Sequence, residues 1–331
     1  MHVAVVGVGG AGNNLLNQAI DRGMNPKNCV AVNTDRGQLS ESPAQNKVLL
    51  ADNVGNGTQW SRQAPGSLSV LAHRVTPFTR ESDFTILLTG LGGVTGTKTA
   101  PVIAQLHRSQ VRPVVSVVAL PFIHERERRF VALRGLKRMI EACDCTVVVD
   151  NSIQKKAKSS FQRVADEMVA SAVRTLSDVV AMGNRVLSRR VLNVLSLGHV
   201  ATVCIAPVVA NDEIQSAVID ALGTPSARLP LSGARGAVVV FRGPEPLGTG
   251  LSARAYETIA YLAGHDLEFV QVNLQSPTPP SVSIFLTGYS YGTALGGFVD
   301  LIQDLYDVEY GQESSSAEIG LPIQLYQMES S

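Results

Sequence analysis

The chain has 331 residues and no net formal charge; 45% of it is hydrophobic, 17% charged and only 5% aromatic. This composition excludes a disordered or fibrous protein, and the length suits about two domains. With few aromatic residues, the core must consist mainly of Val, Leu, Ile and Ala. Such cores are typical of α/β proteins with buried parallel strands.

The zero net charge hides an uneven distribution. All 28 Lys and Arg residues lie at or before Arg254, whereas ten of the 28 acidic residues follow it, so residues 1–254 carry +10 and residues 255–331 carry −10. The basic part has no aromatic-interleaved basic motif, and we therefore predict no nucleic-acid partner. Two oppositely charged regions instead favour head-to-tail contacts between copies.

The four cysteines are too sparse for a disulfide framework and lack the partners of a zinc site, so we predict reduced core residues and no metal centre. No apolar run approaches the roughly 18 residues that span a bilayer. The chain also opens without a signal-peptide pattern. We expect a cytoplasmic protein that does not insert into membranes.

Apolar strands alternate with helices along the first half. Glycine turns follow the first and fourth strands, and helical spacing follows each turn at 13–20 and 101–107. We expect an open parallel sheet that binds its ligand at the carboxyl ends of the strands. The predicted strands cover residues 2–6, 29–32, 48–50, 84–88, 114–120 and 146–149.

The second half begins with unbroken helical spacing over residues 159–182. Strands are then expected at 201–209, 236–242, 267–274 and 282–286, with helices at 212–222 and 252–263. The predicted fold is α/β: a Rossmann-like nucleotide-binding domain with a mostly parallel sheet, a long central helix and a smaller α/β second domain. The expected boundaries are 1–158, 159–182, 183–310 and a polar tail at 311–331.

The first glycine turn has the G-x-G-x-x-G spacing, with Gly7, Gly9 and Gly12 directly after a strand. Glycines let phosphate oxygens approach the N–H groups at a helix start. With Asp35 at the ribose-binding distance, the motif alone indicates a dinucleotide-binding oxidoreductase. A turn that merely packs strand against helix is the other interpretation.

The second glycine turn, residues 90–98, also lies between a strand and a helix and adds two hydroxyl groups. It is not a P-loop, because Thr97 stands where that motif requires its second glycine. Two amide-rich turns suit a nucleoside triphosphate.

Together these segments resemble the tubulin and FtsZ family of GTP-binding cytoskeletal proteins, and FtsZ more than tubulin. The resemblance spans nearly the whole chain, through VVGVGGAGNN, VAVNTD, GLGGVTGTKTAPVIA, PFIHERERR and SGARGAVVVFRG. The family signature G-G-G-T-G-[ST]-G is altered here, with Val94 and Lys98 in place of glycines. The resemblance implies bound GTP or GDP. Mg²⁺ is expected only because it normally accompanies a triphosphate.

The resemblance also implies a set of binding residues. Glu125 and Arg129 match ribose- and phosphate-side positions, and Asn151 and Asp166 match positions that hydrogen-bond guanine. Gln162 stands where the family has a base-stacking aromatic residue. The remaining implied contacts are Gly9, Gly10, Ala11, Gly12, Asn14, Asn33, Gly92, Gly93, Val94, Thr95, Gly96 and Thr97.

The loop expected after the long helix departs from the family. The resemblance implies that this loop carries acidic residues and that GTP is hydrolysed when a neighbouring subunit inserts it. This chain has no Asp or Glu between Asp178 and Asp212. The loop instead carries Leu187, Ser188, Arg189 and Arg190. Without a carboxylate to hold the attacking water, hydrolysis should be weak or absent.

We therefore expect an FtsZ-like protein of cell division or shape control that binds guanine nucleotide and assembles head to tail with itself or a relative. The tail segment 321–326 resembles peptides that bind membrane-tethering or division partners. The alternatives are a NAD- or FAD-dependent oxidoreductase and an interaction protein that binds no nucleotide.

Overall fold

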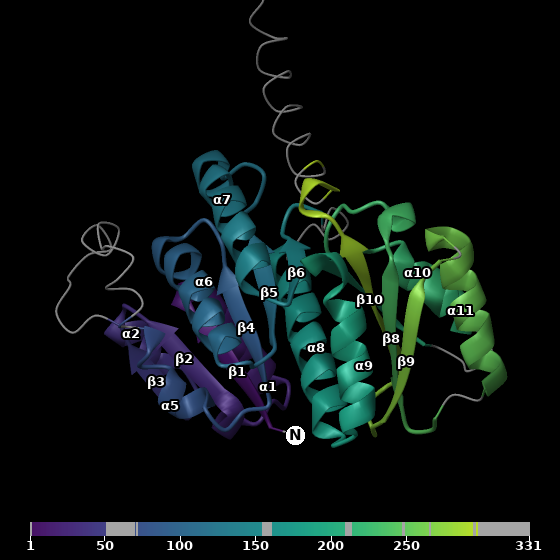
Figure 1. Cartoon of the computed structure of the whole chain (residues 1–331), viewed down its shortest axis with the longest axis horizontal. Coiled ribbons are helices and arrows are strands. Elements are labelled where there is room, and N and C mark those ends of the chain that lie inside the picture. Colours follow the sequence, from purple (N-terminus) through teal and green to yellow (C-terminus); the bar gives the residue numbers. More distant parts are fainter. Residues whose placement is uncertain are drawn as a thin grey trace, which may run out of the picture.

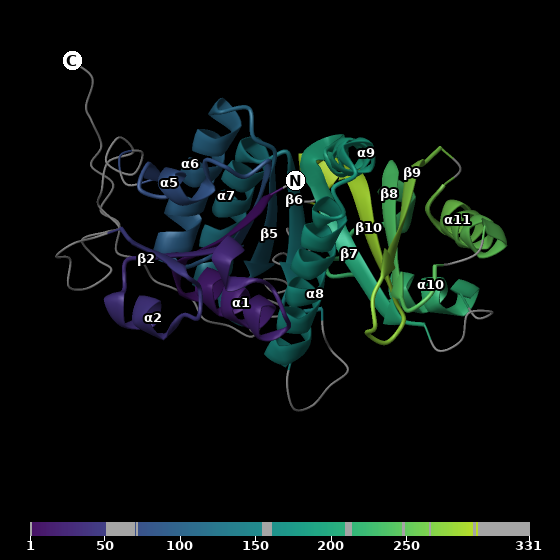
Figure 2. The ribbon, with the colours of Figure 1, turned by 90° about the horizontal axis from the view of Figure 1, so that it is seen from below.

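The structure is a computed structural model that describes residues 2–50, 70, 72–153, 161–208, 214–246, 249–264, 266–293 and 296. Its centre is one ten-stranded sheet in the order β3-β2-β1-β4-β5-β6-β7-β10-β8-β9. Helices cover both faces of the sheet, and the long helix α8 crosses its middle (Figures 1 and 2). The predicted α/β fold with a mostly parallel sheet is confirmed.

The first six strands are all parallel, and most of their residues are buried because helices lie on both faces. This explains why β1, β4 and β5 are almost continuous apolar runs. The six strands are β1 (Val3–Val8), β2 (Cys29–Asn33), β3 (Asn46–Leu49), β4 (Phe84–Gly90), β5 (Val114–Leu120) and β6 (Cys145–Asp150).

The helices of this half connect the parallel strands. They are α1 (Gly9–Asp21), α2 (Arg36–Glu41), α5 (Thr76–Thr79), α6 (Val94–Ser109), α7 (Arg126–Ala142) and α8 (Phe161–Ala181), with the short 3-10 helix η1 (Pro26–Asn28). The predicted central helix corresponds to α8. Its expected first residues, 159 and 160, lie outside the described part of the chain.

The second half continues the same sheet through β7, which pairs in parallel with the start of β6 at Thr146–Val200 and Val147–Ala201. β10 then inserts antiparallel between β7 and β8. The strands are β7 (Val200–Pro207), β8 (Gly236–Gly243), β9 (Glu268–Gln275) and β10 (Ser281–Tyr289). The helices are α9 (Arg185–Leu195), α10 (Ile214–Leu222), α11 (Thr249–Ala263), η2 (Leu197–His199) and η4 (Leu231–Gly233).

The helix starts predicted after the two glycine turns are too late. α1 begins at Gly9 rather than at residue 13, and α6 begins at Val94 rather than at residue 101. The first glycine turn therefore forms the first turn of α1, and the second runs into the first turn of α6, although glycine is a poor helix former. Close packing against neighbouring backbone, described below, outweighs that low propensity.

All four cysteines are free and buried, as predicted. Burial raises the pKa of the Cys29 and Cys204 thiols to about 12, so neither carries a reactive thiolate at neutral pH. Within the described ranges, no helix is long and apolar enough to cross a membrane, and no cluster of His, Cys, Asp and Glu could hold a metal ion.

Candidate functional site

The first glycine turn joins β1 directly to α1. Gly9 has a φ of +75°, which a residue with a side chain rarely adopts. Gly12 packs tightly, because a Cβ there would lie 2.5 Å from the Leu88 carbonyl oxygen on β4. A Cβ at Gly10 would meet the flexible Gln38 side chain. Packing of strand against helix thus explains why residue 12 is a glycine. It does not explain Gly10, because the Gln38 side chain could move to make room for a Cβ.

The second glycine turn joins β4 to α6. Gly92 has a φ of +92°, and its N–H donates to Thr97 Oγ1 at 2.9 Å, which closes the turn. A Cβ at Gly93 would meet nothing within 4 Å. Val94, the first residue of α6, is 41% exposed. The hydrogen bond to Thr97 closes the turn at Gly92, whereas the space beside Gly93 is empty.

The two turns lie against each other. A Cβ at Gly9 would lie 3.0 Å from the Gly96 amide nitrogen, and one at Gly90 would lie 2.4 Å from Ala11 Cβ. Neither α1 nor α6 has a side-chain N-cap or an acidic residue in its first turn. Two helix N-termini with uncapped N–H groups therefore meet at one place, where the positive ends of their dipoles favour an anion.

The end of β2 borders this place. Asn33 Nδ2 donates to Gln38 Oε1 at 2.8 Å, and the Thr34 and Thr95 hydroxyl groups lie 3.1 Å apart. Asp35 instead caps α2, accepting from the backbone N–H groups of Gly37 and Gln38. Its Oδ1 atom thus has a structural role at the start of α2, which accounts for Asp35 without a ribose contact.

A cavity of about 380 Å³ opens beside α1 and the ends of β5 and β6, lined by Ala11, Asn14, Leu15, Asn17, Gln18, Ala119 and Asn151. Its volume lies in the range of small-molecule sites. Its polar lining is made of side-chain amides, with no charged residue among the lining residues.

Two of these amides are placed with opposite hydrogen-bonding character. Asn151 Oδ1 is buried and has no hydrogen-bond partner, which is rare for a buried polar atom in a native protein. Asn17 Oδ1 accepts from the Ser42 hydroxyl at 2.7 Å, so the NH₂ group of Asn17 remains available as a donor. Asp166 lies in α8, but its side chain is outside the described part of the chain.

Glu125 and Arg129 bind other protein groups. Glu125 Oε2 accepts from the Phe122 N–H at 3.0 Å, and its Oε1 pairs with Arg128. Arg129 is 2% exposed and forms a bidentate pair with Asp150 at the end of β6, at 3.0 and 2.6 Å. This pair fixes the start of α7 beside the sheet. Direct contacts of Glu125 and Arg129 with a nucleotide remain predictions.

The segment expected to be a degenerate catalytic loop is a helix, which corrects the sequence prediction. Leu187, Ser188, Arg189 and Arg190 all lie in α9, whose N-cap is Asn184: its side chain accepts from the Leu187 N–H at 3.0 Å. The cap and the apolar spacing that follows stabilise a helix. Ser188 is buried, whereas Arg189 and Arg190 are exposed.

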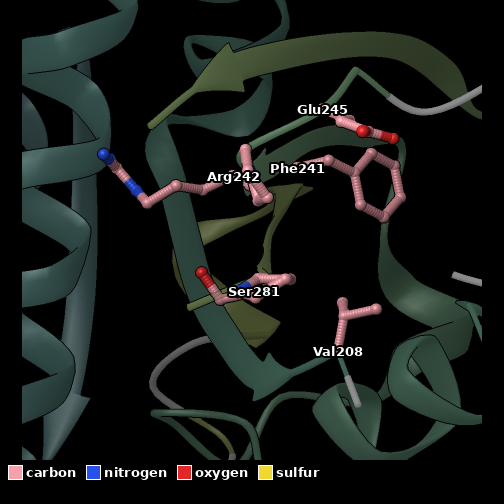
Figure 3. Close-up of a pocket in the computed structure, with 8 residues that line it drawn as sticks. Val208, Phe241, Arg242, Glu245 and Ser281 are labelled. Carbon is pink, nitrogen blue, oxygen red and sulfur yellow. The ribbon is translucent and has the colours of Figure 1, made fainter. Parts of the chain in front are cut away.

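A second cavity, of about 140 Å³, lies at the ends of β7 and β8 and the start of β10 (Figure 3). It is smaller than most ligand sites. Figure 3 shows the Arg242 guanidinium pointing away from Phe241 and Glu245; it bonds to Asp178 on α8 at 2.7 Å. This cavity is therefore a poor candidate for the main site.

The fold defines an α/β protein of the nucleotide-binding class, with two helix N-termini paired at the carboxyl ends of parallel strands, where such folds bind their ligands. Residues 2–157 match the model of the Tubulin/FtsZ family, GTPase domain. The chain is 31% identical over 257 residues to "Cell division protein FtsZ 1" of Methanocaldococcus jannaschii, covering 74% of this chain and 70% of the relative. It belongs to the Tubulin/FtsZ family.

Further similarities agree with this assignment. "Cell division protein FtsZ 1" of Pyrococcus horikoshii is 32% identical over 257 residues, covering 73% of this chain and 68% of that protein. An empty FtsZ dimer from M. jannaschii superposes with a TM-score of 0.73 at 27% identity, covering 87% and 88% of the two chains. A GTPγS-bound protofilament of CetZ2 from Haloferax volcanii gives 0.75 at 22% identity, covering 94% and 100%, and so supports the fold alone.

The structure brings most of the predicted residues into one region. Both glycine turns and Asn33 lie around the paired helix N-termini, while Ala11, Asn14 and Asn151 line the adjoining cavity. Sequence reasoning missed five nearby polar residues. Only Thr34 carried a signal, as part of the NTD segment. The others are recognisable only from their contacts or their place in the cavity lining: Asn17, Gln18, Gln38 and Ser42.

Proposed function

We propose that this chain is a guanine-nucleotide-binding filament protein of cell division or shape control, that it acts in the cytoplasm, and that it hydrolyses GTP weakly or not at all. The observation that carries the proposal is the meeting of two uncapped helix N-termini at Gly9 and Gly96. A polyphosphate supplies the several anionic oxygens that two sets of N–H groups can bind.

The residues present fit a nucleoside triphosphate. The open space at Gly93 leaves the second turn accessible to phosphate, and the amide-lined cavity beside α1 suits an uncharged base and ribose. Asn151 Oδ1 would accept an N–H from the base, which satisfies its missing bond. A guanine edge offers such donors at N1 and the 2-amino group.

Weak hydrolysis is inferred from the chemistry of α9. Attack on a terminal phosphate needs a water that a polar group orients, usually by accepting its proton. The stretch between Asp178 and Asp212 offers no carboxylate, and α9 exposes Arg189 and Arg190. If the next subunit docks α9 over the nucleotide, these guanidinium groups would hold phosphate oxygens without activating water.

Self-association is supported by a similar solved structure, the empty FtsZ dimer from M. jannaschii. A head-to-tail filament places one copy's α9 against the next copy's glycine turns. Magnesium belongs to the proposal as the usual companion of a triphosphate. Binding of the tail at 311–331 to a tethering or division partner remains a prediction, since those residues lie outside the described part of the chain.

The deciding experiment measures binding, assembly and turnover on the same purified full-length chain. We expect GTP and GDP to bind while ATP and NAD do not, GTP to induce pelletable polymer, and phosphate release to stay at or only slightly above the level of a GTP blank. No binding of guanine nucleotide would refute the whole proposal. Binding and assembly with phosphate release at a rate typical of the family would refute only the hydrolysis claim.

A further inference from the structure

The exposed surface of α7 combines apolar and basic side chains. Phe130 and Val131 are 56% and 44% exposed, and Arg134, Lys137 and Arg138 are exposed as well. Their spacing of three and four residues places them on one side of the helix. The Arg134 guanidinium lies 4.8 Å from the centre of the Phe130 ring, so the two kinds of side chain are interleaved. These five residues are called the α7 face.

The described chain ends beside this face. After β10, the Tyr291 ring lies 5.8 Å from Lys137 Nζ, and the nearby Glu141 carboxylate adds to the desolvation that raises the pKa of Tyr291. Figure 1 shows α7 and the yellow segment after β10 at the same end of the molecule. The remaining residues, 297–331, therefore start close to the α7 face.

The composition of residues 297–331 complements the α7 face. The segment contains seven acidic residues and no Lys or Arg, so it carries −7 and the preceding residues carry +7. Apolar and acidic residues are mixed within its first part, in the order FVDLIQDLYDVEY. Such a segment can offer carboxylates to the basic side chains and apolar groups to Phe130 and Val131.

We propose that the acidic C-terminal segment, residues 297–331, docks on the α7 face of its own chain. Because the segment is tethered next to the face, its effective concentration is in the millimolar range, and modest contacts suffice to hold it there. The helix is about 26 Å long by its 17 residues, a distance that about eight extended residues can cover. This inference is independent of nucleotide binding and goes beyond the proposed function.

The test is carbodiimide cross-linking of the full-length chain, which joins lysines to carboxylates in direct contact. Lys137 is the one lysine of the α7 face, and its 4.0 Å pair with Glu141 provides an internal reference product. We expect a second product that links Lys137 to an acidic residue in 297–331. High salt should reduce this product, because screening weakens contacts between exposed charges.

A matched pair of variants tests the charge complementarity. Arg134→Gln/Arg138→Gln keeps Lys137 as reporter and should lower the tail product at least threefold relative to the Lys137–Glu141 product. Arg80→Gln/Arg228→Gln removes the same charge elsewhere on the exposed surface and should leave the ratio unchanged.

Three outcomes would overturn the proposal. The first is a tail product absent at Lys137 although the Glu141 reference forms. The second is tail products confined to Lys155, Lys156 and Lys158, the other lysine cluster in the sequence. The third is a product that joins two chains in a mixture of heavy-isotope and ordinary protein, which would assign the segment to a second copy.

Discussion

Arg129 and Asp150 form a buried ion pair between the start of α7 and the end of β6, with side chains 2% and 0% exposed and a shortest N–O distance of 2.6 Å. Arg129 also donates to the Pro121 carbonyl oxygen and the Ser152 hydroxyl group. The pair therefore ties together the two loops that follow β5 and β6, which border the amide-lined cavity. Position 129 shapes the site whether or not it touches a ligand.

Breaking this pair should destabilise the protein strongly. Asp150→Ala leaves a buried guanidinium without its countercharge, and we expect a loss of about 3–5 kcal/mol in the free energy of unfolding. Urea denaturation measures it. Glu81→Gln, which removes the exposed 3.8 Å pair with Arg80, should cost less than about 0.5 kcal/mol. Equal effects of the two changes would contradict this account.

The glycine turns allow fold and ligand binding to be separated. A Cβ at Gly93 would meet no atom within 4 Å, and the backbone there is extended, with φ −89° and ψ 160°. We therefore expect Gly93→Ala to change the free energy of unfolding by less than about 0.5 kcal/mol. GTP binding should weaken at least tenfold, because the methyl group occupies the opening to the turn.

Gly90→Ala is the matched control for Gly93→Ala. Its Cβ would lie 2.4 Å from Ala11 Cβ, and we expect it to destabilise the fold by about 1–3 kcal/mol through overpacking. Calorimetric titration and urea unfolding of both variants give the comparison. Wild-type affinity in Gly93→Ala would place the phosphate elsewhere.

Asn151 provides a test of the base contact. Asn151→Ala removes the unpartnered Oδ1, and we expect GTP affinity to fall about tenfold, the equivalent of one hydrogen bond of about 1.4 kcal/mol. Preference for GTP over ATP should shrink with it. Asn28→Ala, at an exposed position in η1, is the control. Unchanged selectivity would mean that Asn151 does not read the base.

The sequence predicts the strands well and the helix starts poorly, for a physical reason. β1, β4 and β5 are buried on both faces, so their apolar runs are unmistakable. Local propensity assigns the first turns of α1 and α6 to loops, because both turns contain or follow glycines. Only contacts such as that of Gly12 with Leu88 show why such residues are helical. α9 was missed because Asn184 and the arginines after it resemble a polar turn.

The site shows the same division. Glycines at fixed spacing identify both turns from the sequence alone, because the residues of each turn are close together in the chain. The Arg129–Asp150 pair joins residues 21 positions apart, and Ser42 reaches Asn17 from 25 positions away. No spacing rule links such residues, so their roles appear only once the chain is folded.

His107 makes stability depend on pH. It is fully buried at the end of α6, where Thr79 Oγ1 lies 2.9 Å from Nε2 and Nδ1 has no partner. Desolvation, with the charge of Arg112, lowers its pKa from 6.5 to about 4. Between these values the unfolded chain binds more protons than the folded one, so stability falls as pH drops from 6.5 to 4.

The corresponding loss is about 3 kcal/mol at most for a shift of this size. In urea unfolding at several pH values, His107→Gln should flatten the dependence between pH 4 and 6.5 relative to the wild type. His73→Gln, at an exposed position, should preserve it. An unchanged slope in His107→Gln would assign the acid sensitivity to other groups.

Arg189 and Arg190 provide the test of the filament surface. Both are exposed on α9 and belong to a body whose positive charge balances the acidic C-terminal part of the chain. If they meet the next copy's nucleotide, Arg189→Glu/Arg190→Glu places four carboxylate oxygens against phosphate. GTP-dependent pelleting should then disappear, while GTP binding by the monomer stays at the wild-type level.

Arg80→Glu/Arg228→Glu is the control, because it makes the same change of charge elsewhere, and this variant should pellet normally. Wild-type polymer should also decline as salt rises from about 50 to 300 mM, because the Debye length shortens over that range. Pelleting that survives the α9 double change would show that the arginines lie outside the contact between copies and that they do not account for weak hydrolysis.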